Sequence, residues 1–136
     1  MSDEKIDNQK IIQSNLIRSR IKELLNNLLS GDISDAAVIR RDGLIIEAIE
    51  KIKNNINWKG ISINAAHVIN FSETLSNEIY MGDFETSVIE TDYQRIVLSK
   101  INNICFLITI IAKKQNYTLE MLKISETSKK LRELLS

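Results

Sequence analysis

The chain has 136 residues, a length that suits one domain and is too short for two. Hydrophobic residues make up 43% of it and charged residues 26%, values that are typical of a globular protein and not of a disordered one. Eighteen basic residues balance eighteen acidic ones, so the charge indicates neither nucleic acid nor an anionic membrane as a partner. The polar start of the sequence and its short apolar runs predict no signal peptide and no membrane insertion, and we expect a cytoplasmic protein.

The first predicted element is a helix over residues 10–30. Its apolar residues recur at helical spacing along one stripe: Ile17, Ile21, Leu24, Leu25 and Leu28. Gly31 follows at the place where helices often end in a left-handed residue. Ile12 and Leu16 fall off the stripe, so we expect them at the surface. Residues 1–9 are interpreted as a flexible lead-in to a single domain over residues 10–136.

A β-hairpin is predicted next. Two β-prone runs, residues 36–39 and 44–46, are joined through Asp42-Gly43, and this dipeptide favours a tight turn because glycine accepts positive φ. A polar loop with several asparagines, residues 50–60, separates the hairpin from the next helix.

Residues 61–79 are predicted to form a second helix with two distinct sides. One side, expected to face the core, carries Ile61, Ala65, Val68, Ser72, Leu75 and Ile79. The opposite side, expected to face outward, carries Ile63, Ala66, His67, Asn70, Glu73 and Asn77.

Three strands and a third helix complete the chain. The strands are expected over residues 84–90, 94–101 and 104–112, and the helix over residues 117–135. The last strand is apolar at nearly every position, which is typical of a central strand covered on both faces. Hairpins require an antiparallel sheet, so the order of elements predicts an α+β sandwich with helices covering the sheet.

The sequence contains no recognisable catalytic motif. With one histidine and one cysteine there is no metal-ligand set and no CxxC pair, and no glycine-rich phosphate loop is present. His67 is interpreted as a surface or interface residue and Cys105 as a buried, inert thiol. We therefore expect no enzyme activity, no cofactor and no bound metal.

In its ordered set of motifs the chain resembles the Roadblock/dynein light chain family, over about residues 10–135. The matching segments are 35–46 around Asp-Gly-Leu, 63–66, Gly82 with 88–90, 95–98, 105–110 and 131–135. The chain departs from the family in a longer and more basic 50–60 loop, and in Asn116 where the family often has glycine.

The resemblance implies a profilin-like, five-stranded antiparallel sheet with helix 2 on one face and helices 1 and 3 on the other. It implies a prokaryotic-type homodimer, paired through helix 2 and the edge strand after it, that serves as a scaffold or regulator for a small Ras-like GTPase. The dimer residues it suggests are Ile63, Ala66, Asn70, Phe84, Thr86 and Val88. The partner-binding residues it suggests are His67, Glu73, Thr74 and Asn77. The alternative hypothesis is a small-molecule sensor domain, because fold does not fix function.

Overall fold

The computed structural model describes residues 2–53, 56–79 and 82–136, with side chains from Asn8 onward. The elements in these ranges follow one another in the predicted order. They are α1 (Ser2–Leu28), β1 (Ile33–Arg40), β2 (Ile45–Glu50), α2 (Trp58–Glu78), β3 (Thr86–Glu90), β4 (Gln94–Lys100), β5 (Cys105–Ala112) and α3 (Thr118–Leu135). The asparagines at 54 and 55, expected in the 50–60 loop, lie outside the described residues.

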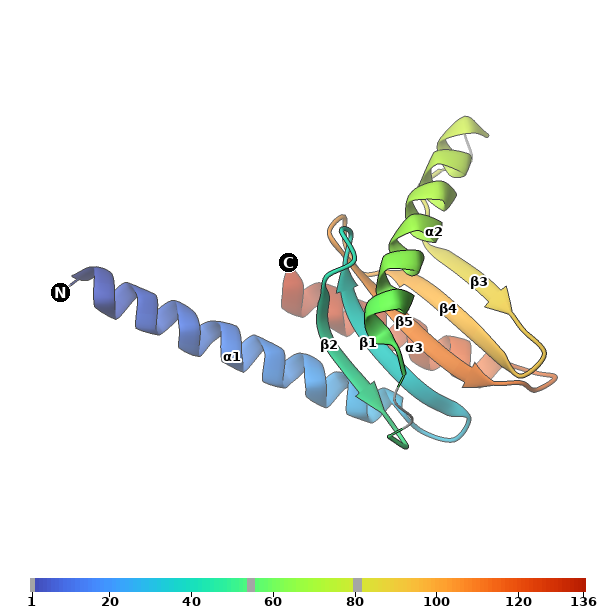
Figure 1. Cartoon of the computed structure of the whole chain (residues 1–136), viewed down its shortest axis with the longest axis horizontal. Coiled ribbons are helices and arrows are strands. Elements are labelled where there is room, and N and C mark those ends of the chain that lie inside the picture. Colours follow the sequence, from blue (N-terminus) through green and yellow to red (C-terminus); the bar gives the residue numbers. More distant parts are fainter. Residues whose placement is uncertain (1, 54–55, 80–81) are drawn as a thin grey trace.

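The strands form one antiparallel sheet in the order β2-β1-β5-β4-β3. Helix α2 crosses one face, and α1 and α3 cover the other (Figure 1). The apolar β5 is buried along all but its last residue, as expected for a central strand. The predicted fold class is therefore confirmed.

Each face of the sheet carries its own apolar core, because side chains alternate between the faces along a strand. The core under α1 and α3 contains the predicted stripe residues Ile21, Leu24, Leu25 and Leu28. The core under α2 is smaller and includes Ala65, Ile69 and Phe106. Two helices and the larger core thus cover one face of the sheet, and one helix and the smaller core cover the other.

Helix α1 begins earlier than predicted. Residues 2–9, interpreted from the sequence as a lead-in, are helical, since they contain no glycine or proline and several good helix formers. The N-terminal half of α1 extends away from the sheet (Figure 1). Ile12 and Leu16 are exposed there, as predicted. None of the helices in the described ranges has an apolar stretch long enough to cross a lipid bilayer.

The β1–β2 turn has the predicted geometry. Gly43 has φ 89°, a conformation that residues with a side chain rarely adopt. The Arg40 N–H donates to the carbonyl of Leu44 at 2.8 Å and closes the turn.

Candidate interaction surface on helix α2 and strand β3

Helix α2 starts three residues before its predicted beginning. The side-chain oxygen of Asn57 accepts a hydrogen bond from the Gly60 N–H at 3.1 Å, so Asn57 caps the helix and Trp58 is its first residue. The Trp58 indole N–H donates to Glu50 Oε1 at 3.1 Å, and its ring packs against the core under α2. These contacts fix the N-terminal end of α2 on the sheet.

The side of α2 that faces the sheet differs from the predicted one. Its buried residues are Ser62, Ala65, Ala66 and Ile69. Leu75 and Ile79, expected in the core, are 51% and 57% exposed. Ala66, expected to face outward, is buried. The prediction of the inward face was therefore confirmed for Ala65 and, in part, for Ile61 and Val68, which pack against the core, and it was wrong for Leu75, Ile79 and Ala66. The buried face is rotated about the helix axis relative to the predicted one.

Close packing explains the rotation. A Cβ atom on Gly43 would lie 3.3 Å from the Ile63 Cα, so the β1–β2 turn and the backbone of α2 are nearly in contact. Ser62, Ala65 and Ala66 leave room for such an approach, whereas a row of leucine and isoleucine would not. The larger apolar side chains are consequently left on the flank of α2 that faces β3 and β4.

That flank borders an apolar groove. The groove has a volume of about 330 Å³ and lies between α2 and the strands β3 and β4. Its apolar walls are formed by Ile61, Ala65, Val68, Ile89, Ile96 and Leu98. No other element in the described ranges closes it.

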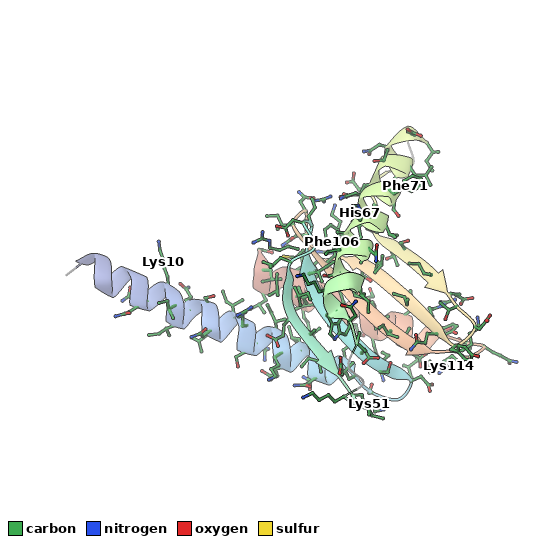
Figure 2. All side chains as sticks on the ribbon, in the orientation of Figure 1. Lys10, Lys51, His67, Phe71, Phe106 and Lys114 are labelled. Atoms are coloured by element: carbon green, nitrogen blue, oxygen red, sulfur yellow. The ribbon has the colours of Figure 1, made fainter. Side chains whose placement is uncertain are left out.

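The apolar flank continues along α2 beyond the groove. Phe71, Leu75 and Ile79 follow Val68 at spacings of three or four residues, so they lie along one side of the helix. Phe71 is 72% exposed, and Figure 2 shows it on the part of α2 that extends past the sheet. We call Val68, Phe71, Leu75, Ile79 and Ile89 the α2–β3 apolar surface.

Strand β3 forms the edge of the sheet beside this surface. It pairs with β4 on one side only, and most of its residues are exposed. The unpaired side presents backbone N–H and C=O groups that another strand could bind. An apolar surface and an open sheet edge thus lie next to each other.

No family model and no curated protein matches the chain. Solved structures do match it. An MglB with a tetrameric arrangement aligns with a TM-score of 0.79 at 13% identity, over 87% of this chain and 89% of that one. Gliding protein MglB from Thermus thermophilus aligns with a TM-score of 0.79 at 14% identity, over 87% and 90% of the two chains.

A Roadblock/LC7 domain from Streptomyces avermitilis aligns with a TM-score of 0.73 at 15% identity, over 82% and 94% of the two chains. The chain has the Roadblock fold. The similarity predicted from the ordered motifs is therefore confirmed at the level of the fold.

Within this Roadblock fold, the residues suggested as a dimer interface do not form one surface. Ala66 and Phe84 are buried inside the subunit. Ile63 lies against the β1–β2 turn and Asn70 binds Arg41, on the flank of α2 away from the apolar groove. Thr86 and Val88 do lie on the edge strand, but their register partners, Ser99 and Val97, place them on the α3 face.

Arg41 connects the β1–β2 turn to α2 and to the β4–β5 turn. Its guanidinium donates to both carboxylate oxygens of Glu73, to Asn70 Oδ1 at 3.1 Å and to the Asn103 carbonyl at 2.9 Å. It also lies over the Phe106 ring, 5.1 Å from the centroid. The hydrogen bonds raise the pKa of Arg41 and lower that of Glu73, so both groups are held charged.

The partner-binding residues suggested from the sequence divide into two groups. His67, Thr74 and Asn77 are exposed along the outer side of α2, where Figure 2 shows His67. Glu73 instead is half-buried against Arg41. Nothing in the sequence near Glu73 indicated this ion pair, because its two members are 32 residues apart.

The described residues contain no group of three or more histidine, cysteine or acidic side chains that could hold a metal ion. Cys105 is 7% exposed, and its burial raises the pKa of the thiol, which favours the unreactive protonated form.

Proposed function

We propose that the chain is a non-catalytic, homodimeric interaction module that binds and regulates a small Ras-like GTPase. The observation that carries the proposal is the α2–β3 apolar surface beside an open sheet edge. Exposed apolar residues gathered in one place commonly mark a site of protein association.

A second copy of the chain is the occupant that fits this surface best. Two copies related by a two-fold axis would bring the same apolar residues against each other, as a self-complementary interface requires. The β3 strands would then pair and satisfy the backbone groups of the edge. The tetrameric arrangement stated for one of the similar MglB structures supports association between copies.

The dimer residues we now propose differ from those suggested by the sequence. They are the α2–β3 apolar surface together with Thr86 and Val88 on the edge strand. Ala66 and Phe84 are not included, since they are buried within the subunit. Ile63 and Asn70 are exposed, but they lie on the other flank of α2, beside the β1–β2 turn and Arg41.

The GTPase would bind the outer side of α2. In the proposed dimer, the two copies of His67, Thr74 and Asn77 would lie on one broad face. These are short or singly ionisable side chains, so specificity would come from hydrogen bonds and charge complementarity. A regulator of this kind would hold the catalytic loops of the GTPase in place and contribute no arginine of its own. Arg41 is bound to Glu73, and Arg40 pairs with Asp42.

The proposal is tested by titrating the protein into a small Ras-like GTPase from the same genome, loaded with GDP or with a non-hydrolysable GTP analogue. Asn77→Arg should weaken binding by about tenfold or more, because it places a bulky charge on the contact face. Asn26→Arg on exposed α1 is the matched control and should leave binding unchanged. Equal binding by Asn77→Arg and the unchanged protein, with the dimer intact, would exclude the outer side of α2 as the GTPase site.

A further inference from the structure

A polar pocket lies on the face of the sheet opposite α2. It has a volume of about 290 Å³ and lies open to solvent between α3 and the strands β3 and β4. Met121 and Ile124 form the apolar part of its lining, and most of the rest consists of hydroxyl and cationic side chains: Thr86, Ser99, Ser125, Ser128, Lys129 and Arg132. The proposed dimer and GTPase surfaces do not account for this concentration of hydrogen-bonding groups.

Two of these hydroxyls are buried and make no hydrogen bond. Ser99 is 5% exposed and Ser128 is 6% exposed, and neither Oγ has a partner among the described residues. Buried polar groups in folded proteins nearly always have a partner, because losing water without gaining one is costly. The two hydroxyls therefore have hydrogen-bonding capacity that no described residue uses and that a water or a bound ligand would satisfy.

Ser128 lacks the hydrogen bond to its own helix that serine hydroxyls often form. A serine within a helix often donates to the carbonyl four residues earlier, as Ser72 does to Val68 at 2.8 Å and Ser76 does to Ser72 at 2.9 Å in α2. Ser128 makes no such bond in α3. On β4, Ser99 pairs in register with Thr86, so their side chains share the α3 face. Hydroxyls thus line the pocket from both a helix and the sheet.

The rim of the pocket is cationic. Arg132 Nε donates to the Ile101 carbonyl at 2.8 Å, which fixes the guanidinium while its terminal nitrogens bond to no other described residue. Lys129 forms no ion pair with a described residue. Glu85 also lines the pocket, but it is exposed and its charge is screened by solvent. Lys100 contributes through its backbone, since its side chain alternates to the α2 face, where its charge lowers the pKa of Glu73.

We propose that this pocket binds a small tetrahedral oxyanion, either free phosphate or the phosphoryl group of a small molecule. A tetrahedral anion accepts hydrogen bonds from several directions at once, which matches a pocket lined by hydroxyl residues of α3, β3 and β4. A guanidinium held by its Nε presents its remaining donors in a plane, the geometry that arginine uses for phosphate. The site lies on the α3 face and shares only Thr86 with the proposed dimer, so Ser99, Ser128, Lys129 and Arg132 lie outside both the dimer and the GTPase surfaces.

The test is a titration of the whole protein with inorganic phosphate at constant ionic strength, followed by the amide NMR shifts of Ser99 and Ser128. Saturable shifts at both amides are expected. Arg132→Gln should weaken phosphate binding by about tenfold, because a charge-assisted hydrogen bond is lost. Lys130→Gln removes an equal charge from α3 outside the pocket and should change the affinity less than twofold. Ser128→Ala should also weaken binding, and it should not lower the thermal stability, since it removes an unpaired buried hydroxyl.

Glycerol 3-phosphate in a parallel titration identifies the source of the anion. Tighter binding than phosphate would assign the site to a phosphorylated small molecule, and weaker binding would assign it to free phosphate, both within the proposal. Shifts that fail to saturate, equal weakening by Lys130→Gln and Arg132→Gln, or acetate binding as tightly as phosphate would each overturn it.

Discussion

Both carboxylate oxygens of Glu73 accept hydrogen bonds from the guanidinium of Arg41. The pair joins the β1–β2 turn to the part of α2 where the helix leaves the sheet. Ile69 is the last buried residue of α2 among those described, and Phe71, Leu75 and Ile79 beyond it are exposed. Arg41 therefore helps to set the direction in which the apolar flank of α2 points.

We expect a double-mutant cycle of Arg41→Ala and Glu73→Ala to give a coupling energy of about 1 kcal/mol in chemical denaturation. The bidentate geometry strengthens the pair, while partial exposure and solvent screening reduce it. The exposed pair Arg20–Glu23 on α1 is the matched control, and its coupling should be about 0.5 kcal/mol or less. Equal coupling in the two pairs would mean that the Arg41 contacts do not hold α2.

A second prediction concerns the turn beneath α2. Gly43→Ala should lower the free energy of unfolding by roughly 2–3 kcal/mol, because alanine is strained at positive φ and its Cβ would press on the Ile63 backbone. Gly31→Ala also replaces a positive-φ glycine, but nothing lies within 4 Å of its new Cβ, so about 1 kcal/mol is expected. Urea denaturation of both variants measures the difference. If Gly31→Ala proves as costly as Gly43→Ala, the close approach of turn and helix contributes nothing.

The third prediction is a pH dependence centred on Lys114. Its ammonium bonds Asp32 at 2.8 Å and the buried Glu120 at 2.9 Å, near the start of α3 (Figure 2). These contacts raise the pKa of Lys114 from 10.5 to about 12 and lower those of Asp32 and Glu120 from 3.8 and 4.5. The charged carboxylates of Asp32 and Glu120 stabilise the fold fully when the pH is above their pKa values in the unfolded chain. This stabilisation is lost as the pH falls through their lower pKa values in the folded protein. The contribution of Lys114 is fully present below pH 10.5 and is lost as the pH rises through about 12.

Lys114→Met should therefore lower the melting temperature at pH 7, and the deficit relative to the unchanged protein should shrink below about pH 4. Lys113→Met is the control, since Lys113 pairs with exposed Glu90 at a longer 3.4 Å and its loss should have a smaller effect. Thermal unfolding between pH 3 and pH 9 measures both. A deficit that stays constant across this range would show that Lys114 acts through packing and not through its charge.

The sequence predicts the structure correctly where residues close together in the chain determine it. The stripe from Ile17 to Leu28 faces the core, Gly43 turns the first hairpin, and the continuous apolar run of β5 occupies the centre of the sheet. In each case the local sequence is compatible with one arrangement only: an apolar stripe faces the core, a glycine adopts positive φ, and a continuous apolar run lies in the centre of the sheet. Together with the resemblance of the ordered motifs, these features were sufficient to predict the fold.

The candidate surface was harder to predict, because contacts between distant segments determine it. Periodicity assigns Leu75 and Ile79 to the core, since a large apolar stripe normally faces inward. The close approach of α2 to the β1–β2 turn, together with the short sheet edge at β3, reverses this assignment. The engagement of Glu73 by Arg41 and the unpaired Ser99 and Ser128 likewise depend on residues far apart in the sequence. For this reason Ala66, which was predicted to face outward, is buried, and Leu75, which was predicted to face inward, is exposed.

We propose that the α2–β3 apolar surface binds a second copy of the chain. Light scattering coupled to size-exclusion chromatography at micromolar concentration measures the mass of the assembly. The unchanged protein should have twice the chain mass of 15.6 kDa, and Leu75→Glu should have the single-chain mass with unchanged circular dichroism. A glutamate at position 75 stays solvated in the monomer but would be buried without a partner in the dimer. Leu16→Glu, on the exposed side of α1, should remain a dimer. A single-chain mass for the unchanged protein, or a dimer that persists in Leu75→Glu, would contradict the claim.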